Sequence, residues 1–341
     1  MIKSERKVFS VVVTAHNRRN FLLNALRSVV NQDFPLEKIE IILLKNFLDA
    51  EIDSFCRVNN IITINYSADN ENNLGNYLYE GIRRSDAEII SFLDDDDEWD
   101  THKVSRIVNI FNKHADLCYV HNDFDPINEI GETIKHKRMV DPVINKYAHD
   151  YMILTGHDLG RTMRSLFAAK ADFNLSCMSI RKSCLTKELM QLLRKIEGAP
   201  DAFFFFSVLL TNRSLCILST HLTKYRFHST NISNISNLHS KGMQVARQLK
   251  TLEMLYQFFS VNGNNGYELL SLKMMVTEYE LLRTIFLQQY SRRWVLRQII
   301  TMFIFPHRVS NPLRWRVVIF SLLGTVDPSF PTKLYKFFTH S

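Results

Sequence analysis

The sequence from Glu88 to Asp100 reads Glu88-Ile89-Ile90-Ser91-Phe92-Leu93-Asp94-Asp95-Asp96-Asp97-Glu98-Trp99-Asp100, a short apolar run that ends in four consecutive aspartates. An apolar run of this length is typical of a strand buried on both faces of a parallel sheet. The acids then follow its carboxyl end, where open α/β sheets bind their ligands. A dense cluster of hard oxygen ligands there indicates a divalent cation that holds a phosphate-bearing substrate.

A solvated acidic turn that caps a following helix is the simpler interpretation of an acidic run. Four acids directly after a buried strand, however, repel one another unless a cation gathers them. We therefore favour the cation site and expect Mg²⁺ or Mn²⁺, because Mg²⁺ takes one or two protein carboxylates and completes its shell with phosphate oxygens and water.

Apolar runs alternate with amphipathic segments on the N-terminal side of the aspartates. The expected strands span 8–14, 39–44 and 61–65, and the expected helices 21–30, 50–58 and 73–84. This order predicts a parallel sheet with helices on both faces, as in nucleotide-binding folds. Neither GxGxxG nor GxxxxGK[ST] occurs, so the phosphates must be held in another way, and a bound cation is the remaining candidate.

On the C-terminal side of the acids, we expect helices at 102–113 and 183–195, strands at 117–120, 176–181, 215–218 and 222–227, a turn at 125–131 and loops over 135–159. Asp201 stands at the start of an apolar helix. It is either a cap or first-turn charge, or a carboxylate base, and the residues alone leave both open. His228 follows the last strand, and its role is either structural or that of a phosphate or metal ligand.

The length of 341 residues and the 46% hydrophobic content predict one catalytic-size domain with an extension. We place the domain at 1–238 and a helical extension at 239–341. The five cysteines are odd in number and lack CxxC or zinc-finger spacing, which indicates a reducing compartment. The polar N-terminus runs directly into a strand, so we expect no signal peptide.

The C-terminal segment from Arg283 to Ser341 is basic, with nine Lys or Arg and one acid, a net charge of +8. The helices expected at 245–259 and 269–290 pad the catalytic core. Trp294–Phe305 and Trp315–Leu323 are too short to span a bilayer, which needs about 20 apolar residues. Both are flanked by Arg and Trp, as in interfacial helices near anionic headgroups. Nucleic acid fits less well, because the basic residues are interleaved with bulky aliphatics.

Taken together, these residues resemble glycosyltransferase family 2, the inverting enzymes of the GT-A fold that use nucleotide-activated sugars. The similarity covers residues 7–233. Ser10–Arg18 is similar to the family's first strand and nucleotide-contacting loop, and Asn73-Leu74-Gly75 matches its Asn-x-Gly turn. Phe92–Asp97 matches Phe-Leu-Asp-x-Asp-Asp, with Asp94 and Asp96 as the DxD pair.

Further positions extend the resemblance. Pro200-Asp201 occupies the place of the family's Glu-Asp, whose Asp is the general base. Tyr225–His228 is similar to the Tyr-Arg-x-His segment that closes over the diphosphate, and Lys103 falls where the family has a Lys. One departure follows the second strand, where Lys45-Asn46-Phe47-Leu48 replaces Asp-Asp-Gly-Ser, whose first acid contacts the nucleobase.

The resemblance implies an α/β GT-A mixed sheet flanked by helices, with a C-terminal helical extension. It implies metal-dependent transfer of a sugar, with inversion, from a nucleotide-diphosphate donor to a hydroxyl of a glycan or lipid-linked acceptor. Asp201 would be catalytic, and Asp94, Asp96 and His228 would bind the metal. The donor-binding residues would be Thr14, Ala15, His16, Arg18, Asn73, Gly75, Asp94, Asp95, Lys103, Arg226 and His228. The role of Asp97 stays open.

We expect this enzyme on the cytoplasmic side, peripheral at the inner face of the cell membrane, with an anionic membrane surface and no nucleic acid as partners. One alternative is a metal-dependent nucleotidyltransferase, which would need a more basic loop than Ala15–Arg18. The other is a non-catalytic nucleotide-sugar binder or membrane scaffold. The presence of both the DxD pair and Asp201 argues against it.

Overall fold

The computed structural model describes residues 7–66, 74–134, 150–155, 166–167, 170–211, 213–228, 237–262, 266–287, 291–304, 318–319 and 321–327. The chain divides into two compact units. The first comprises 1–196 with 200–228, and the second 197–199 with 229–341.

The first unit contains a mixed sheet that, within the described residues, runs in the order β3-β2-β1-β4-β8-β6-β9-β5, with β7 paired to β9. Strands β3, β2, β1 and β4 are parallel, and β8 is antiparallel to both β4 and β6. The strands are β1 (Phe9–Ala15), β2 (Ile39–Lys45), β3 (Ile62–Asn65), β4 (Ile89–Asp94), β5 (Glu98–Trp99), β6 (Leu117–Ile127), β7 (Tyr151–Leu154), β8 (Met178–Arg181) and β9 (Ser214–Arg226).

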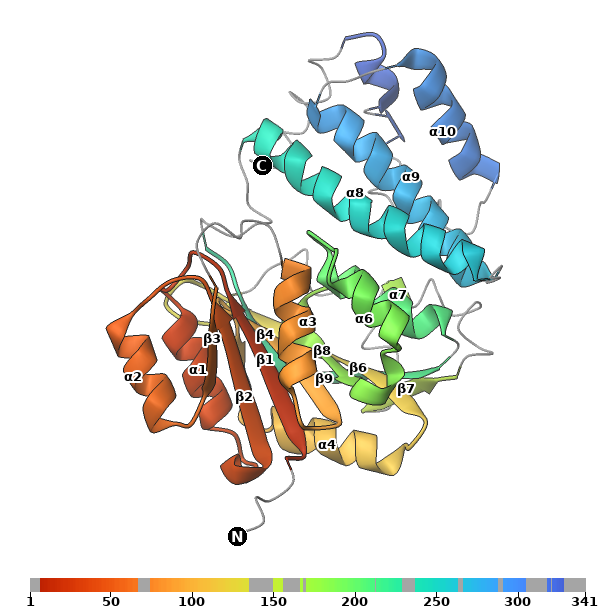
Figure 1. Cartoon of the computed structure of the whole chain (residues 1–341). Coiled ribbons are helices and arrows are strands. Elements are labelled where there is room, and N and C mark those ends of the chain that lie inside the picture. The colour runs from red at the N-terminus through yellow and green to blue at the C-terminus, as the bar shows by residue number, and fades with distance from the viewer. Residues whose placement is uncertain are drawn as a thin grey trace. The chain divides into compact units, whose positions relative to one another are not determined.

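Helices cover both faces of this sheet, as the alternating pattern predicted (Figure 1). Successive residues of β1 point to opposite faces of the sheet. Val11 and Val13 belong to the cluster that also contains buried residues of α1, α2 and α4. Val12 lies on the other face, against Gly81 of α3. On α3's face, Phe204 of α7 stacks on Phe92 of β4 at 4.5 Å between ring centroids. The helices are α1 (Leu22–Val30), α2 (Ala50–Val58), α3 (Leu74–Arg84), α4 (Lys103–Lys113), α6 (Lys187–Leu193) and α7 (Pro200–Leu210).

The far side of the sheet differs from the sequence prediction in strand length. Strand β6 extends to Ile127, so the turn predicted at 125–131 begins later, at Asn128, and β9 is one strand of 13 residues where we expected two. The polar residues at this point are accommodated because register shifts interrupt the β6–β9 ladder and His221 pairs with Asp123 and Asp125. Strand β7 lies within the predicted loop region 135–159, of which 135–149 and 156–159 fall outside the described residues.

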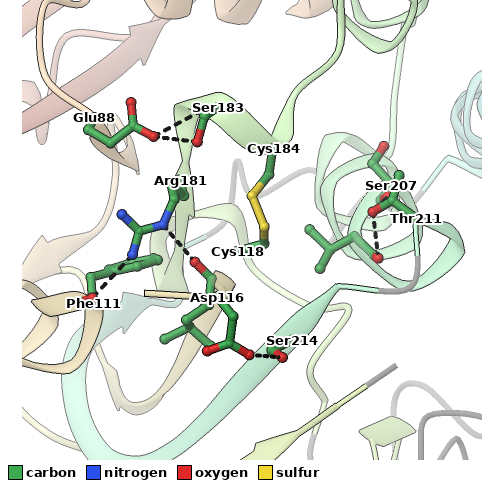
Figure 2. The surroundings of a disulfide bond; sticks show 12 residues. Glu88, Phe111, Asp116, Cys118, Arg181, Ser183, Cys184, Ser207, Thr211 and Ser214 are labelled. Carbon is green, nitrogen blue, oxygen red and sulfur yellow. Dashed lines mark hydrogen bonds between the residues drawn. A yellow bond between two sulfur atoms is a disulfide. The ribbon is translucent and has the colours of Figure 1, made fainter. Parts of the chain in front are cut away.

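A disulfide joins Cys118, in β6, to Cys184, at the end of the short 3-10 turn η4 (Lys182–Cys184) (Figure 2). Beside it, Arg181 donates to the backbone oxygen of Leu117 at 2.9 Å. The cysteine spacing did not predict this pair, because strand β6 brings together two cysteines that lie far apart in the sequence. The expectation of a reducing compartment stays a prediction. The remaining cysteines are buried free thiols: Cys56, Cys177 and Cys216.

The second unit is helical, with α8 (Leu238–Val261), α9 (Tyr267–Leu287) and α10 (Arg292–Ile304). Gly242 lets α8 approach Leu287 of α9 closely, because a Cβ there would lie 2.5 Å from its side chain. Helix α10 packs through Val295 and Ile299 into a cluster with α9. Within the described residues, none of the helices combines the length and apolarity needed to cross a membrane.

Candidate active site

The candidate site is built where the parallel strands β1 and β4 end side by side. Thr14 of β1 is in register with Asp94 of β4, so the loop after β1 meets the acidic loop. Arg18, from the first loop, forms ion pairs with Asp95 and, at 2.6 Å, with Asp96. Adjacent parallel strands thus bring together residues far apart in the sequence, at the edge where such sheets bind ligands.

The four aspartates of the acidic loop differ in their electrostatic environment. Burial, together with the charges of neighbouring acids, raises the pKa of Asp94 to about 8. Burial also raises the pKa of Asp95 to about 7, although Arg18 opposes this. For Asp96, burial alone would raise the pKa, but the hydrogen bond to His228 and the charge of Arg18 outweigh it and lower the pKa. Burial therefore favours the neutral forms of Asp94 and Asp95, whereas His228 and Arg18 favour the charged form of Asp96.

The same contacts act on the pKa of Arg18. Burial alone would lower the pKa of Arg18, but its pairing with Asp95, Asp96 and Asp94 outweighs burial and raises it. Arg18 is therefore a permanent positive charge placed on the acidic loop.

His228 is buried at the end of the strand β9 segment and faces the acidic loop. Its Nε2 atom lies 3.1 Å from Oδ2 of Asp96, and its ring contacts Phe21 at 5.0 Å between centroids. The two groups are within hydrogen-bonding distance of each other, and both an imidazole nitrogen and a carboxylate oxygen are common ligands of divalent cations. Within the described residues, no group of three or more His, Cys, Asp or Glu side chains is arranged to hold a metal.

Arg226 is placed differently from the expected contact with a diphosphate. Its side chain is fully buried, and its guanidinium donates to the backbone oxygens of Asp96, Asn128 and Glu129 and pairs with Glu98. At least four of its five N–H donors are therefore engaged within the protein. This geometry favours a structural role, in which Arg226 fixes the acidic loop to strand β9.

Asp97, whose role the sequence left open, is buried in the same connection. Its Oδ1 atom accepts the backbone N–H of Arg226 at 3.0 Å, while Oδ2 is buried without a hydrogen-bond partner in the described part of the chain. Burial, followed by repulsion from Asp96 and Asp94, raises the pKa of Asp97 well above its usual value. Asp97 thus joins the acidic loop to β9 rather than facing the ligand edge.

Lys103 is also buried, in contrast to the donor contact that the motif implies. Its Nζ atom donates to the backbone oxygen of Ser176 at 2.6 Å and to Thr223 at 3.0 Å, and lies 4.5 Å from the ring centroid of Trp99. Burial lowers the pKa of Lys103 to about 7. The side chain supports the site from within the core, because it is fully shielded from solvent.

Asp201 lies in the first turn of α7 and is half-buried. Its Oδ1 atom accepts the backbone N–H of Ala202 at 2.9 Å, as a first-turn charge does. Burial raises the pKa of Asp201 to about 6. The charge of Asp201 contributes in turn to the raised pKa of Asp94. The structure thus shows Asp201 as a first-turn charge of α7, and its role as a carboxylate base stays a prediction.

The loop after β1 carries the remaining predicted donor contacts. Thr14 and Ala15 are buried at the strand end, while His16 is exposed and lies 6.2 Å from the ring of Tyr77. Tyr77 of α3 in turn stacks on Tyr66, which follows β3, at 4.2 Å. Tyr66 and Tyr77 were not predicted. The position of Tyr66 directly after a strand that ends at the ligand edge would have been the sequence signal for the first of them.

Asn46 occupies the place after β2 where the family has an acid. Its side chain exchanges hydrogen bonds with Asn17, at 2.8 Å to the backbone N–H and 2.9 Å to the side-chain oxygen. The two loops at the ends of β1 and β2 are therefore held together by an amide pair. This pair replaces the negative charge that Asp-Asp-Gly-Ser would supply there.

The Asn-x-Gly turn is only partly visible, because Asn73 lies outside the described residues. Gly75 is buried against the end of α6, where a Cβ would lie 2.1 Å from the backbone oxygen of Leu193. Its backbone N–H donates to Ile196 at 3.2 Å. Gly75 is thus required for the close approach of α3 and α6, which differs from the expected donor contact.

Comparisons with known proteins place this geometry in context. Residues 10–183 match the family described as glycosyl transferase family 2. The minor teichoic acid biosynthesis protein GgaB of Bacillus subtilis (strain 168) is 26% identical over 118 residues, which are 33% of this chain and 13% of GgaB. The match therefore spans only a small part of that relative.

Solved structures share the fold. The crystal structure of S. aureus TarS 1-349 has a TM-score of 0.53 at 13% identity and covers 94% of this chain and 81% of that one. The structure of TarS 1-349 in complex with UDP-GlcNAc has a TM-score of 0.55 at 14% identity, and the match covers 92% of this chain and 80% of that one. The structure of S. aureus TarS has a TM-score of 0.57 at 15% identity, and the match covers 94% of this chain and 54% of that one. The predicted GT-A fold with a helical C-terminal region is confirmed. With a family match over half of its length, this chain belongs to glycosyl transferase family 2.

Proposed function

We propose that this chain is an inverting glycosyltransferase that moves a sugar from a nucleoside-diphosphate donor to a hydroxyl acceptor. The observation that carries the proposal is the acidic loop at the ligand edge of the sheet, where Asp94 ends β4 in register with Thr14 of β1 and Arg18 pairs with Asp95 and Asp96. We propose that this loop holds the diphosphate and that Asp201, at the start of α7, serves the acceptor hydroxyl.

Asp201 is the proposed general base. It removes the proton of the acceptor hydroxyl as the oxygen attacks the anomeric carbon from the face opposite the leaving diphosphate, which inverts the configuration. A carboxylate with a pKa of about 6 is a stronger base than an exposed aspartate and is still ionised at neutral pH.

Asp94, Asp96 and His228 are the proposed ligands of Mg²⁺ or Mn²⁺. Such an ion, when bound, would offset the negative charge that develops on the departing nucleoside diphosphate. Arg18 is the proposed second contact of the diphosphate, because its guanidinium lies against Asp95 and Asp96. Guanidinium groups suit phosphate oxygens through paired N–H donors.

The proposed donor is a UDP-sugar. TarS 1-349 was crystallised with UDP-GlcNAc and with UDP, which supports this class of nucleotide. His16 and Tyr66 supply aromatic surface beside the ends of β1 and β3 for a nucleobase to stack on, and the buried ring of Tyr77 supports Tyr66 from behind. The acceptor is proposed to be a glycan or a lipid-linked polymer, and the similarity to a teichoic acid biosynthesis protein supports that class.

Turnover separates this proposal from a non-catalytic binder. UDP release would be measured with UDP-GlcNAc, UDP-GalNAc, UDP-glucose and UDP-galactose, with Mg²⁺, with Mn²⁺ and with EDTA. Asp201→Asn is expected to keep donor binding, measured by calorimetry, and to lose UDP release by at least about 100-fold. Asp33→Asn, an exposed aspartate paired with His102, is the matched control and keeps turnover. Binding without turnover in the unmodified protein would contradict the proposal, as would full turnover in Asp201→Asn.

We further propose that the protein associates peripherally with the anionic inner face of the cell membrane. Helix α10 supports this, because Leu296 and Ile300 are 43% and 58% exposed and Arg293 and Arg297 lie exposed beside them. Exposed aliphatics next to arginines match an interfacial helix on anionic lipid.

Vesicle flotation tests the membrane proposal. The protein should float with phosphatidylglycerol vesicles at low salt and remain behind with phosphatidylcholine vesicles. The double change Leu296→Glu and Ile300→Glu should abolish flotation. Val261→Glu, at an 85% exposed position on α8, should leave it unchanged. An unmodified protein that does not float with anionic vesicles would show that the membrane proposal is wrong.

A further inference from the structure

The loop after β2 is held in place by Lys45, the last residue of that strand. The Lys45 side chain is fully buried, and its Nζ atom pairs with Asp53 of α2 at 3.0 Å. The same atom donates to the backbone oxygen of Phe47. A buried ammonium keeps such partners, because losing one leaves a charge without compensation inside the protein. Asn46, between Lys45 and Phe47, therefore lies on a fixed segment.

Asn46 joins this segment to the loop after β1. Its side chain is buried, its Oδ1 atom accepts the backbone N–H of Asn17 at 2.8 Å, and its Nδ2 atom donates to Oδ1 of Asn17 at 2.9 Å. Asn17 has φ 56°, in the left-handed region that residues other than glycine rarely adopt, with asparagine among the exceptions. The two hydrogen bonds hold Asn17 in this conformation.

Asn17 directly precedes Arg18 in the chain. The backbone conformation at one residue sets the direction in which the next side chain leaves the chain. The guanidinium of Arg18 reaches Asp95 and Asp96, which lie in another loop. Ordering a long side chain costs up to about 2 kcal/mol of conformational free energy, so a fixed backbone at its origin favours this one placement.

We infer that Asn46 is a positioning residue, which holds Asn17 in its left-handed conformation and thereby directs the guanidinium of Arg18 to the place where the diphosphate binds. The inference rests on the proposed function, in which Arg18 is the second contact of the diphosphate. It gives Asn46 a part in donor binding without contact to the donor. An amide suits this part, because it both accepts and donates and adds no charge that would compete with Asp95 and Asp96 for the guanidinium.

Asn46→Ala tests the inference, because it removes both hydrogen bonds to Asn17. With Mn²⁺, calorimetry should show UDP binding weakened about tenfold in Arg18→Ala, which loses a charge-assisted contact, and about 3- to 10-fold in Asn46→Ala. The double variant should bind UDP no more weakly than Arg18→Ala alone, because Asn46 acts only through Arg18. Losses that multiply in the double variant would overturn the inference.

Asn59→Ala is the matched control. Asn59 follows α2 in the same unit, and its Nδ2 atom donates to the backbone oxygen of Phe55 at 2.9 Å. Its loss should lower Tm and leave the affinity for UDP unchanged. If Asn46→Ala likewise lowers Tm alone, the amide pair is only structural and the inference is overturned.

Asn17→Ala reaches the same pair from its exposed side and leaves the buried Asn46 in place, which guards against misfolding of Asn46→Ala. Alanine loses the side-chain hydrogen bond and disfavours the left-handed conformation by roughly 1–2 kcal/mol. UDP binding should weaken in the same range as in Asn46→Ala. Unchanged affinity in Asn17→Ala would overturn the inference.

A double-mutant cycle in urea tests the placement of Arg18 without a donor. In EDTA, Arg18→Ala should lower the urea midpoint of the unmodified protein and have less effect beside Asn46→Ala, because Arg18 is then no longer directed to the acidic loop. Equal effects in both backgrounds would overturn the inference. If the unmodified protein does not bind UDP, the proposed function fails, and this cycle still decides what places Arg18.

Discussion

The Nη1 atom of Arg18 lies 2.6 Å from Oδ2 of Asp96, and the same guanidinium pairs with Asp95. An arginine from the loop after β1 thus supplies positive charge to the acidic loop. Oδ2 of Asp96 is also the atom that faces His228. We therefore expect Arg18 and a divalent cation to act on the same carboxylate, so that either can relieve the repulsion among the acids.

Arg18→Ala tests this relationship. In EDTA, the variant should lose about 2 kcal/mol of unfolding free energy, less than a fully buried pair would, because the Arg18 side chain is 30% exposed. Mn²⁺ should restore part of the loss, since binding to the native state stabilises it. The measurement is Tm and urea unfolding with and without Mn²⁺.

Arg19→Ala provides the comparison for that experiment. Arg19 is the neighbouring residue. Its side chain is 58% exposed and its Nη1 atom lies 4.0 Å from Oδ2 of Asp49, a long and solvent-screened ion pair, so its loss should leave stability unchanged. Equal stability of Arg18→Ala and Arg19→Ala in EDTA would contradict the role given to Arg18.

The pH dependence of turnover follows from Asp201. Its pKa of about 6 means that the carboxylate loses its charge as the pH falls through 6, and a protonated carboxyl cannot accept the acceptor's proton. We expect log kcat to fall with a slope near one below about pH 6. Initial rates between pH 4.5 and 8 with UDP-GlcNAc and Mn²⁺ measure this. A flat profile down to pH 5 would be incompatible with Asp201 as the base.

The fold could be predicted because a short run of apolar residues indicates a buried strand. The run before Asp94 is buried on both faces, and parallel neighbours at strand ends follow from the alternation of strands and helices. The length of β6 could not be predicted, since Asp123 and Asp125 are polar and resemble a turn. Their pairing with His221 depends on a strand distant in the sequence.

For the site, the sequence indicated which residues lie close together in the fold, but not the directions of their side chains. Lys103 and Arg226 match motif positions, yet both are buried and bonded within the protein. Side-chain direction depends on packing, which a motif does not encode. Asn46 carried a signal only as a departure from the family's acid, because its pairing with Asn17 depends on the left-handed backbone of Asn17.

Asp201→Asn should also stabilise the protein in a defined pH window. The folded-state pKa of about 6 exceeds the unfolded value of about 3.9, so the fold disfavours the charged form. The cost is absent below about pH 4 and is fully present above about pH 6. The asparagine variant should therefore gain up to about 2 kcal/mol at pH 7 and nothing at pH 4. Urea unfolding at both pH values checks this, and equal gains at both would contradict it.

The Cys118–Cys184 disulfide should make stability depend on redox conditions. It closes a loop with a sequence separation of 66, which contains strand β8. In the chain-entropy estimate, such a bond contributes about 4 kcal/mol. Dithiothreitol should therefore lower the urea midpoint, and thiol titration in denaturant should rise from three groups to five. The double variant Cys118→Ser and Cys184→Ser should be insensitive to dithiothreitol. Five titratable thiols in untreated protein would contradict the disulfide. In a reducing compartment the bond would be reduced.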